Sequence, residues 1–350
     1  MNDPAADLLA KGAPAGEVDA AREDGTLHLL ALDYTLFPGA HFLTLPEAAD
    51  RAGLGRDVAV RVARALGLVE SLDERVYGDD DVTNMTHMAD WLATGVDLDV
   101  AMALYRVMGT AMARIAESEV GFVASMLTEA FARGAPQPED SAMLAAVLPA
   151  LAAERLPEIN LMLDYVHRRA LLSAAKREIL WQVGTRAGLT ETTVGFCDLV
   201  GFTAYSRHLD PDELEALVDR FESHSHEIVT AHGGRVVKTI GDAVLFTTTD
   251  PASAVDTALD LAANFSAEGS FADVRAGIAS GQVLNRDGDV YGSVVNLASR
   301  ITGRALPGTV LVDDSVHDAL EESDTLVWRE LRPRKLKGIG SVRLWKVLRR

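Results

Sequence analysis

The chain has 350 residues, of which 48% are apolar, and a formal net charge of −19. This length can bury more than one hydrophobic core, and the acidic charge disfavours nucleic acid or an anionic membrane as a partner. The single cysteine, Cys197, excludes an intramolecular disulfide and suits a cytoplasmic location. The chain shows no signal-peptide pattern and no apolar stretch long enough to span a membrane.

The N-terminal half is predicted to be helical. Residues 1–25 are rich in Ala, Gly, Pro and acidic residues, which is typical of a disordered segment. Residues 26–184 carry apolar side chains at three-to-four spacing and predict an all-helical domain. Helices are expected over 97–130 and 139–153, and Pro157 is expected to open another.

Residues 42–77 resemble a helix-turn-helix, with two short apolar-patterned segments joined by a glycine turn. Residues 41–75 hold five Arg and six Asp or Glu, whereas a DNA-reading unit should be basic. A packing unit is therefore the favoured interpretation, and DNA binding is the alternative.

The pattern changes after residue 190. A linker is predicted over 185–191, followed by an α+β domain over 192–350 in which short β-rich runs alternate with helical stretches. The expected strands are 192–197, 235–240, 243–248, 274–281, 309–312 and 343–348. The expected helices are about 211–232, 251–265 and 293–304.

Two aspartates at strand ends are candidate metal ligands. Asp198 ends an apolar strand, and Asp242 follows Gly241 in a hairpin turn between two β-rich runs. Either aspartate alone is more typical of a surface position. Together, at adjacent strand ends, two carboxylates could share divalent cations with phosphate oxygens.

Asn296 and Arg300 are four residues apart and share one face of a predicted helix. An amide and a guanidinium suit a ribose and a phosphate that gains negative charge in a transition state. Simple solvent exposure explains the same pair.

Four segments of the C-terminal half together resemble the motif set of class III nucleotidyl cyclases, in its order and at its spacings. They are F-C-D-L-V-G-F-T, V-V-K-T-I-G-D-A, D-V-Y-G-S-V-V-N-L-A-S-R and L-K-G-I-G. The resemblance covers residues 192–348 and implies a ferredoxin-like, palm-type βαβ core. It also implies an adenylyl cyclase, which converts ATP to 3′,5′-cyclic AMP and pyrophosphate with two Mg²⁺ or Mn²⁺ ions per site.

The resemblance further implies which residues bind the metals and the phosphates. Asp198 and Asp242 match the metal-binding aspartates, and the backbone carbonyl of Leu199 would also face a metal. The turn at Phe202 and Thr203 would present backbone N–H groups to the phosphates.

Other matched residues are implied to read the base and to stabilise the transition state. Lys238 and Asp289 match the pair that selects adenine, in which Lys donates to N1 and Asp accepts from the N6 amino group. Asn296 would position the ribose, Arg300 would stabilise charge on the α-phosphate, and Lys337 would bind the triphosphate.

In this family one catalytic domain supplies the metal aspartates and a second supplies the Asn and the Arg. Because this chain carries both sets in one domain, the resemblance implies a head-to-tail homodimer with shared sites. The alternatives are a guanylyl cyclase, or a cyclase-like sensor or dimerisation module without activity.

The helical half is similar to the N-terminal domain of mycobacterial-type soluble, pH-sensing cyclases, which inhibits the catalytic domain. The resemblance implies relief of inhibition at acid pH and binding of fatty acids. His167 is the candidate sensor, and a solvated helix histidine is the alternative. A methionine-rich pocket among helices at 97–165 could hold an acyl chain, although an ordinary bundle core explains the same pattern.

Overall fold

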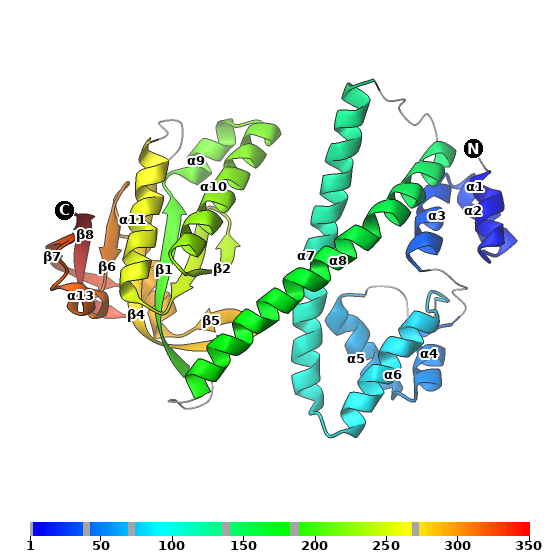
Figure 1. Ribbon diagram of the computed structural model, residues 1–350, viewed down its shortest axis with the longest axis horizontal. Coiled ribbons are helices and arrows are strands. Elements are labelled where there is room, and N and C mark those ends of the chain that lie inside the picture. The colour runs from blue at the N-terminus through cyan, green and yellow to red at the C-terminus, as the bar shows by residue number, and fades with distance from the viewer. Residues whose placement is uncertain (1–2, 38–42, 69–73, 135–140, 183–188, 268–272) are drawn as a thin grey trace. The chain divides into compact units, whose positions relative to one another are not determined.

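The computed structural model describes residues 3–37, 43–68, 74–134, 141–182, 189–267 and 273–350. Contacts divide the chain into two compact units, residues 1–174 and 175–350. Helices form the described part of the first unit, and the second unit combines a sheet with helices (Figure 1). The expected α+β layout, with a helical N-terminal half, is confirmed.

The first three helices share a small core. They are α1 (Pro4–Ala10), α2 (Ala15–Glu23) and α3 (Leu27–Leu36). Leu8 and Val18 are 1% and 2% exposed, and they belong to one core with Tyr34 and Ala145. The prediction that residues 1–25 are disordered is therefore wrong for residues 3–25, the part of this segment that the structure describes. Their few apolar side chains recur at helical spacing, so each short helix has one apolar face that can be buried.

The two short helices expected around a glycine turn are confirmed as α4 (Leu45–Ala52) and α5 (Arg56–Leu66). Thr44 caps α4 in a capping box with Glu47, and Gly53 ends the helix at φ 68°. α6 (Asp79–Ala93) packs against α4.

Four of the five arginines of this helix-turn-helix-like segment are paired with carboxylates. The ion pairs are Arg51 with Asp79, Arg56 with Asp50, Arg61 with Asp99, and Arg75 with Glu47. Neutralised arginines leave little positive charge for a phosphate backbone. The pairing favours the packing interpretation over DNA binding.

Two long helices follow in the first unit, and the second of them continues past the boundary of that unit at residue 174. α7 (Leu98–Ala132) matches the helix expected over 97–130. α8 (Ser141–Gln182) differs from expectation, because Pro149 and Pro157 both lie inside one continuous helix. Each proline removes a single N–H donor, and at the exposed Pro157 water can satisfy the carbonyl that loses its partner.

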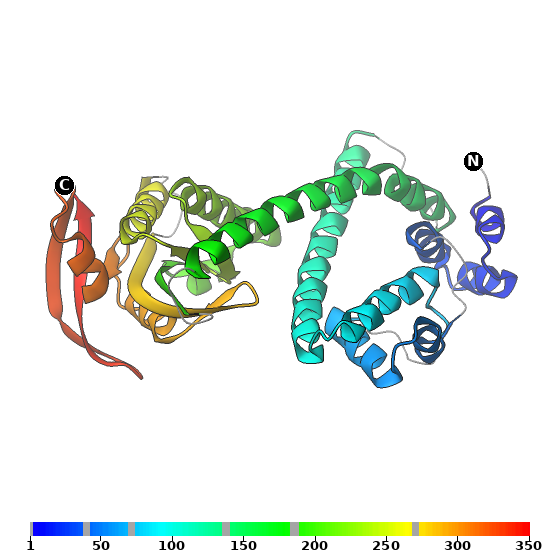
Figure 2. The ribbon, with the colours of Figure 1, turned by 60° about the horizontal axis from the view of Figure 1, so that its bottom comes forward.

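The second unit is built on one mixed sheet with the strand order β2-β3-β1-β4-β6-β8-β7, and β5 pairs with β4. The strands are β1 (Leu189–Leu199), β2 (Arg235–Ile240), β3 (Ala243–Thr248), β4 (Val274–Arg286), β5 (Asp289–Tyr291), β6 (Val310–Val312), β7 (Leu326–Leu336) and β8 (Gly340–Arg349). All six expected strands are present. The β7–β8 hairpin lies at one edge of the sheet (Figure 2), and β7 was missed because it is an edge strand that contains Pro333.

Helices cover both faces of this sheet. α10 (Pro211–Ala231), α11 (Pro251–Ala267) and α13 (Asp314–Leu320) pack on one face, and α12 (Ser293–Thr302) packs on the other. Side chains of β1 alternate between the two cores, as a strand requires. Cys197 and Leu199 pack with α10 and α11, whereas Val194 and Phe196 pack with α12.

The predicted linker over 185–191 differs in part from the structure. Residues 189–191 belong to β1, and Thr190 is only 7% exposed because β4 pairs beside it. Residues 185–188 lie outside the described residues.

Candidate active site

Asp198 projects from the face of the sheet that α12 covers. Its neighbours Cys197 and Leu199 point to the opposite face, and side chains alternate along a strand. Arg275 on β4 and Ala243 on β3 lie directly opposite Asp198, so they project from the same face as Asp198. Asp198 is therefore flanked by paired strands on both sides.

Arg275 forms an ion pair with Asp198. Arg275 Nε donates to Asp198 Oδ2 over 2.8 Å, and a terminal guanidinium nitrogen contacts the same oxygen. The Asp198 side chain is 16% exposed. Burial raises the pKa of Asp198, the hydrogen bond from Arg275 opposes this, and the charge of Asp242 raises the pKa further. A cation close to this half-buried carboxylate favours its charged form.

Asp242 lies in the two-residue turn between β2 and β3, as the sequence predicts. Gly241 has φ 61°, a conformation that glycine adopts easily. The N–H of Leu199 donates to the backbone carbonyl of Asp242 over 3.0 Å, which fixes the turn beside the end of β1. Two carboxylates and Leu199 therefore lie together, and their oxygen donors fit Mg²⁺ or Mn²⁺.

The segment after β1 forms a single helical turn, α9 (Phe202–Tyr205), followed by the 3₁₀ turn η1 (Ser206–His208). The side chain of Phe202 packs against the core beneath α10 and α11. This leaves the backbone of Phe202 as the part that could meet a phosphate. The side chain of Thr203 lies outside the described part of the structure.

Lys238 on β2 and Asp289 on β5 form an ion pair between Nζ and Oδ2. Asp289 Oδ1 also accepts from the N–H of Val290 over 2.8 Å. Burial acts to raise the pKa of Asp289, but the hydrogen bonds from Lys238 and Val290 outweigh it and lower the pKa. The pair thus presents a cationic donor and an anionic acceptor side by side at neutral pH.

Asn296, Arg300 and Lys337 line one pocket with a volume of about 520 Å³. The first two lie on α12, and Lys337 lies in the turn between β7 and β8, close to Ile339. Among the described residues, the structure records no side-chain hydrogen bond or ion pair for any of the three. Their polar groups are available to a bound anion or hydroxyl.

The lining of this pocket does not include the two metal-type aspartates. Neither Asp198 nor Asp242 lines the pocket. The N-terminal end of α12 lies over Gly281, where an added Cβ would meet Val294 at 2.9 Å, and its C-terminal part lies over Gly277, two residues along β4 from Arg275.

Sequence reasoning missed two arginines that contact candidate site residues. Arg275 contacts Asp198, and Arg235 on β2 donates to the carbonyl of Gly288 over 2.8 Å, next to Asp289. The only available signal was a charge inside each β-rich run, V-R-A-G-I and R-V-V-K. The strand registers that give those charges their partners could not be seen in the sequence.

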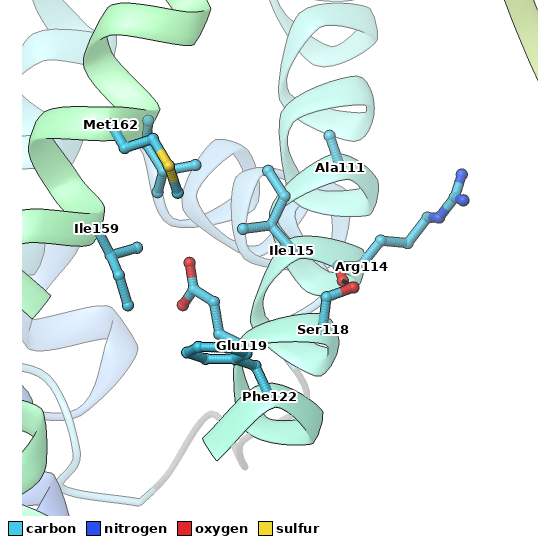
Figure 3. A pocket seen from close by; sticks show the side chains of 9 residues that line it. Ala111, Arg114, Ile115, Ser118, Glu119, Phe122, Ile159 and Met162 are labelled. Carbon is cyan, nitrogen blue, oxygen red and sulfur yellow. Dashed lines mark hydrogen bonds between the residues drawn. The ribbon is translucent and has the colours of Figure 1, made fainter. Parts of the chain in front are cut away.

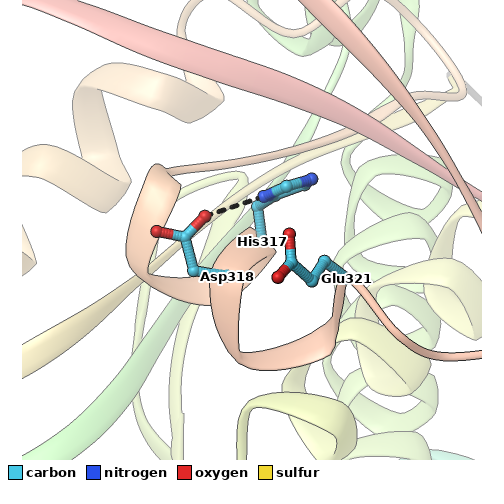
Figure 4. Close-up of side chains that lie close together, drawn as sticks. All are labelled: His317, Asp318 and Glu321. Atoms are coloured by element: carbon cyan, nitrogen blue, oxygen red, sulfur yellow. Dashed lines mark hydrogen bonds and ion pairs between the residues drawn. The ribbon is translucent and has the colours of Figure 1, made fainter.

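A second group of ionisable side chains lies on α13. His317, Asp318 and Glu321 could bring one ligand atom each within 4.8 Å of one another (Figure 4). The His317 ring stacks on Trp345 with centroids 3.6 Å apart, and its Nδ1 lies 2.9 Å from Asp318. Because the ring has these partners and both carboxylates are exposed, we assign no metal site to this group.

The helical unit contains a pocket of about 650 Å³ between α7 and α8 (Figure 3). Its lining is mostly apolar, but Met162 is the single methionine among the described lining residues. Glu119 points into the space and Arg114 points away from it (Figure 3). The expected methionine-rich lining is therefore not found, and the charge that faces the pocket is negative.

His167 is exposed on α8. Within the described residues, the structure records no hydrogen bond, ion pair or ring contact for this side chain. Its role as a pH sensor stays a prediction.

Comparisons with known proteins agree with the division into two units. Residues 186–348 match the adenylate and guanylate cyclase catalytic domain, and residues 5–169 match the adenylate cyclase regulatory domain. An adenylate cyclase of Streptomyces coelicolor is 36% identical over 278 residues, which cover 78% of this chain and 70% of that protein. A pH-sensitive adenylate cyclase of Mycobacterium tuberculosis is 32% identical over 98% of this chain and 86% of its own length.

The guanylate cyclase domain of RhGC from Catenaria anguillulae, solved in complex with GTP, is 27% identical. The structural match covers 47% of this chain and 100% of the solved chain, with a TM-score of 0.43. The sequence relatives show that the chain belongs to the adenylate cyclase family, in which a regulatory domain precedes a class III catalytic domain. Within its described residues, no helix has the length and apolarity to cross a membrane.

Proposed function

We propose that the chain is an adenylyl cyclase that converts ATP to 3′,5′-cyclic AMP and pyrophosphate. The Lys238–Asp289 ion pair carries this proposal. Adenine offers an acceptor at N1 and a donor at its N6 amino group, which matches a lysine beside a carboxylate. Guanine offers a donor at N1 and an acceptor at O6, so the same pair would face two mismatched groups. An unpaired polar group in a site is a strong basis for discrimination.

Asp198, Asp242 and the carbonyl of Leu199 would hold two Mg²⁺ or Mn²⁺ ions. When bound, such ions activate the ribose 3′-hydroxyl and stabilise the pyrophosphate leaving group. Arg300 stabilises the charge that develops on the α-phosphate, and Asn296 orients the ribose so that the 3′-oxygen lies in line.

Lys337 and the turn at Phe202 and Thr203 bind the triphosphate. These residues, together with Asn296 and Arg300, position and neutralise the substrate, so no side-chain nucleophile is needed. Lys337 lines the same pocket as Asn296 and Arg300, which supports this assignment.

Each site is shared between two copies of the chain, which assemble head to tail. This arrangement is supported by the pocket of Asn296 and Arg300, whose lining includes neither Asp198 nor Asp242. Residues from one copy alone would leave either the metals or the transition-state charge without its ligands.

The helical unit regulates the catalytic unit. The match to an adenylate cyclase regulatory domain and the relative named pH-sensitive support this part of the proposal. Protonation of His167 and a fatty acid in the helical unit are two candidate signals. A cytoplasmic location, suggested by the single cysteine, stays a prediction.

The test is the cyclic nucleotide formed from ATP or GTP by the full-length chain with Mn²⁺ or Mg²⁺. We expect cyclic AMP from ATP, and a loss of about 100-fold or more for Asp198→Ala or Arg300→Ala. Asp318→Ala, which changes an exposed carboxylate on α13, is the matched control and should retain activity. Cyclic GMP as the main product, or unchanged activity in Asp198→Ala, would contradict the proposal.

A further inference from the structure

The turn that carries Asp289 is a two-residue hairpin between β4 and β5. Arg286 pairs with Asp289 across the ladder, and the intervening Asp287 and Gly288 have φ of 55° and 78°. Two positive φ values identify a type I′ turn, for which Asp-Gly is a preferred sequence. The carbonyl of Gly288 lies outside the ladder, so a partner for it must come from elsewhere.

Arg235 supplies that partner from the other side of the site. Its Nη1 donates to the carbonyl of Gly288 over 2.8 Å. The next residue in the hairpin, Asp289, contacts Lys238. Arg235 and Lys238 both lie on β2, an edge strand that does not pair with β5, so two successive residues of the hairpin are each held by a β2 side chain.

Regular strand geometry would not allow this double contact. Residues three apart on a strand point to opposite faces of the sheet. Here the register shifts between Val236 and Lys238, which is a β-bulge. Arg235 lies opposite Thr247 and Lys238 lies opposite Leu245, two β3 residues that share a face because they are two apart.

Packing of the neighbouring residues agrees with the bulge. Val236 packs against the core beneath α10 and α11, whereas Val237 packs against the core beneath α12, as does Leu245 opposite Lys238. The extra residue therefore turns Lys238 to the face that Arg235 already occupies. Bulges commonly redirect a side chain beside an active site in this way.

We propose that Arg235 is a positioning residue for base selection: it fixes the Gly288 carbonyl so that Asp289 is held beside Lys238. This inference rests on the proposed adenylyl cyclase activity and on base reading by the Lys238–Asp289 pair. Arg235 does not touch the nucleotide in this proposal. It acts by reducing the number of positions that the β4–β5 hairpin can take, so that the acceptor for the N6 amino group is pre-formed.

The test is the ratio of kcat/KM for ATP to kcat/KM for GTP in the full-length chain with Mn²⁺. We expect Arg235→Met, which keeps an apolar stem and loses the donors, to lower this ratio about three- to tenfold, mainly through KM for ATP. Arg235→Lys keeps one donor and should retain part of the ratio. Both substrates are measured on one preparation. A smaller folded fraction would therefore lower both kcat/KM values equally and leave their ratio unchanged.

Two further variants separate this proposal from a general structural effect. Arg286→Met changes an exposed arginine of the same hairpin whose recorded partner is Asp287, and it should leave the ratio unchanged. Asp289→Ala should lower the ratio, and adding Arg235→Met to it should lower the ratio no further, because Arg235 acts through Asp289.

The outcomes distinguish positioning by Arg235 from base reading by the Lys238–Asp289 pair. If Asp289→Ala lowers the ratio and Arg235→Met does not, positioning by Arg235 is wrong and base reading by the pair stands. If Asp289→Ala leaves the ratio unchanged while cyclic AMP is still formed, base reading by the pair is wrong, and the role of Arg235 fails with it. Additive effects in the double variant would also overturn the proposal.

Discussion

Arg275 and Asp198 lie directly opposite each other on β4 and β1, and Arg275 Nε donates to Asp198 Oδ2 over 2.8 Å. An arginine that already neutralises a metal-type carboxylate competes with the metal. We expect Arg275→Met to bind Mn²⁺ about three- to tenfold more tightly without nucleotide, since a charge-assisted hydrogen bond no longer has to be broken. Calorimetric titration of the nucleotide-free protein measures this affinity.

Arg286→Met is the control for the loss of one positive charge elsewhere on the same unit. It should leave the Mn²⁺ affinity close to that of the unmodified chain. An equal or weaker affinity in Arg275→Met would mean either that Asp198 is not a metal ligand or that Arg275 does not compete for it.

A shared site predicts that two inactive variants rescue each other. Asp198→Ala lacks a metal ligand and Arg300→Ala lacks the transition-state cation, so a mixed dimer has one site with both defects and one intact site. Random pairing of equal amounts should restore about a quarter of the original activity. Cyclic AMP formation after exchange of subunits measures this, and a mixture that stays inactive would contradict shared sites.

The N-terminal helices provide a test of burial with a matched control. Leu8 is 1% exposed in the core of α1, α2 and α3, whereas its neighbour Leu9 is 48% exposed. We expect Leu8→Ala to lower the free energy of unfolding of the helical unit by about 2–4 kcal/mol, and Leu9→Ala to change it by less than about 0.5 kcal/mol. Chemical denaturation measures the difference. If Leu8→Ala and Leu9→Ala lowered the free energy of unfolding equally, Leu8 would not be buried, and the prediction of disorder for this segment would stand.

Asp313 predicts a pH dependence of stability. It is 5% exposed and caps α13 by accepting from the N–H of Val316 over 3.1 Å. Burial raises its pKa to about 6, against about 3.9 in an unfolded chain. Between these values the native state binds a proton that the unfolded state has released. The free energy of unfolding should therefore fall as pH rises from about 4 to 6, by at most about 3 kcal/mol.

Asp313→Asn keeps the acceptor that caps α13 and removes the titration. Relative to the unmodified chain, this variant should gain stability between pH 4.5 and 7.5, as measured by denaturation at each pH. Asp324→Asn, at an exposed position, is the control and should show no such gain. A constant difference between Asp313→Asn and the unmodified chain across this range would contradict a raised pKa.

His167 predicts a pH response of activity rather than of stability. Because its side chain is exposed on α8, replacement should not disturb the fold. If His167 carries the signal, His167→Gln should change the ratio of activities at pH 5.5 and pH 8.0 by about threefold or more, since histidine is the side-chain type suited to a pH switch in this range. His226→Gln, at an exposed position on α10, is the control. If the pH profile of His167→Gln overlapped that of His226→Gln, His167 would not be the pH sensor.

Local sequence patterns determined much of the site. The apolar run before Asp198, the Gly241-Asp242 turn and the four-residue spacing of Asn296 and Arg300 each depend on a few neighbouring residues, and each was found as predicted. The resemblance of the motifs to class III cyclases also predicted that Lys238 and Asp289 act as a pair. Short-range geometry of strands, turns and helices fixes such features, so they can be read from the chain.

Only the tertiary structure decided which charges meet. The pairing of Arg275 with Asp198 depends on the register of β1 against β4, and the contact of Arg235 with Gly288 depends on a bulge in β2. The burial of Leu8 depends on helices that close around it. These features arise from contacts between segments far apart in the chain, where a shift of one residue would exchange the two faces of a strand. The sequence by itself determined the chemistry that is present, and the packing of distant segments decided which groups act on one another.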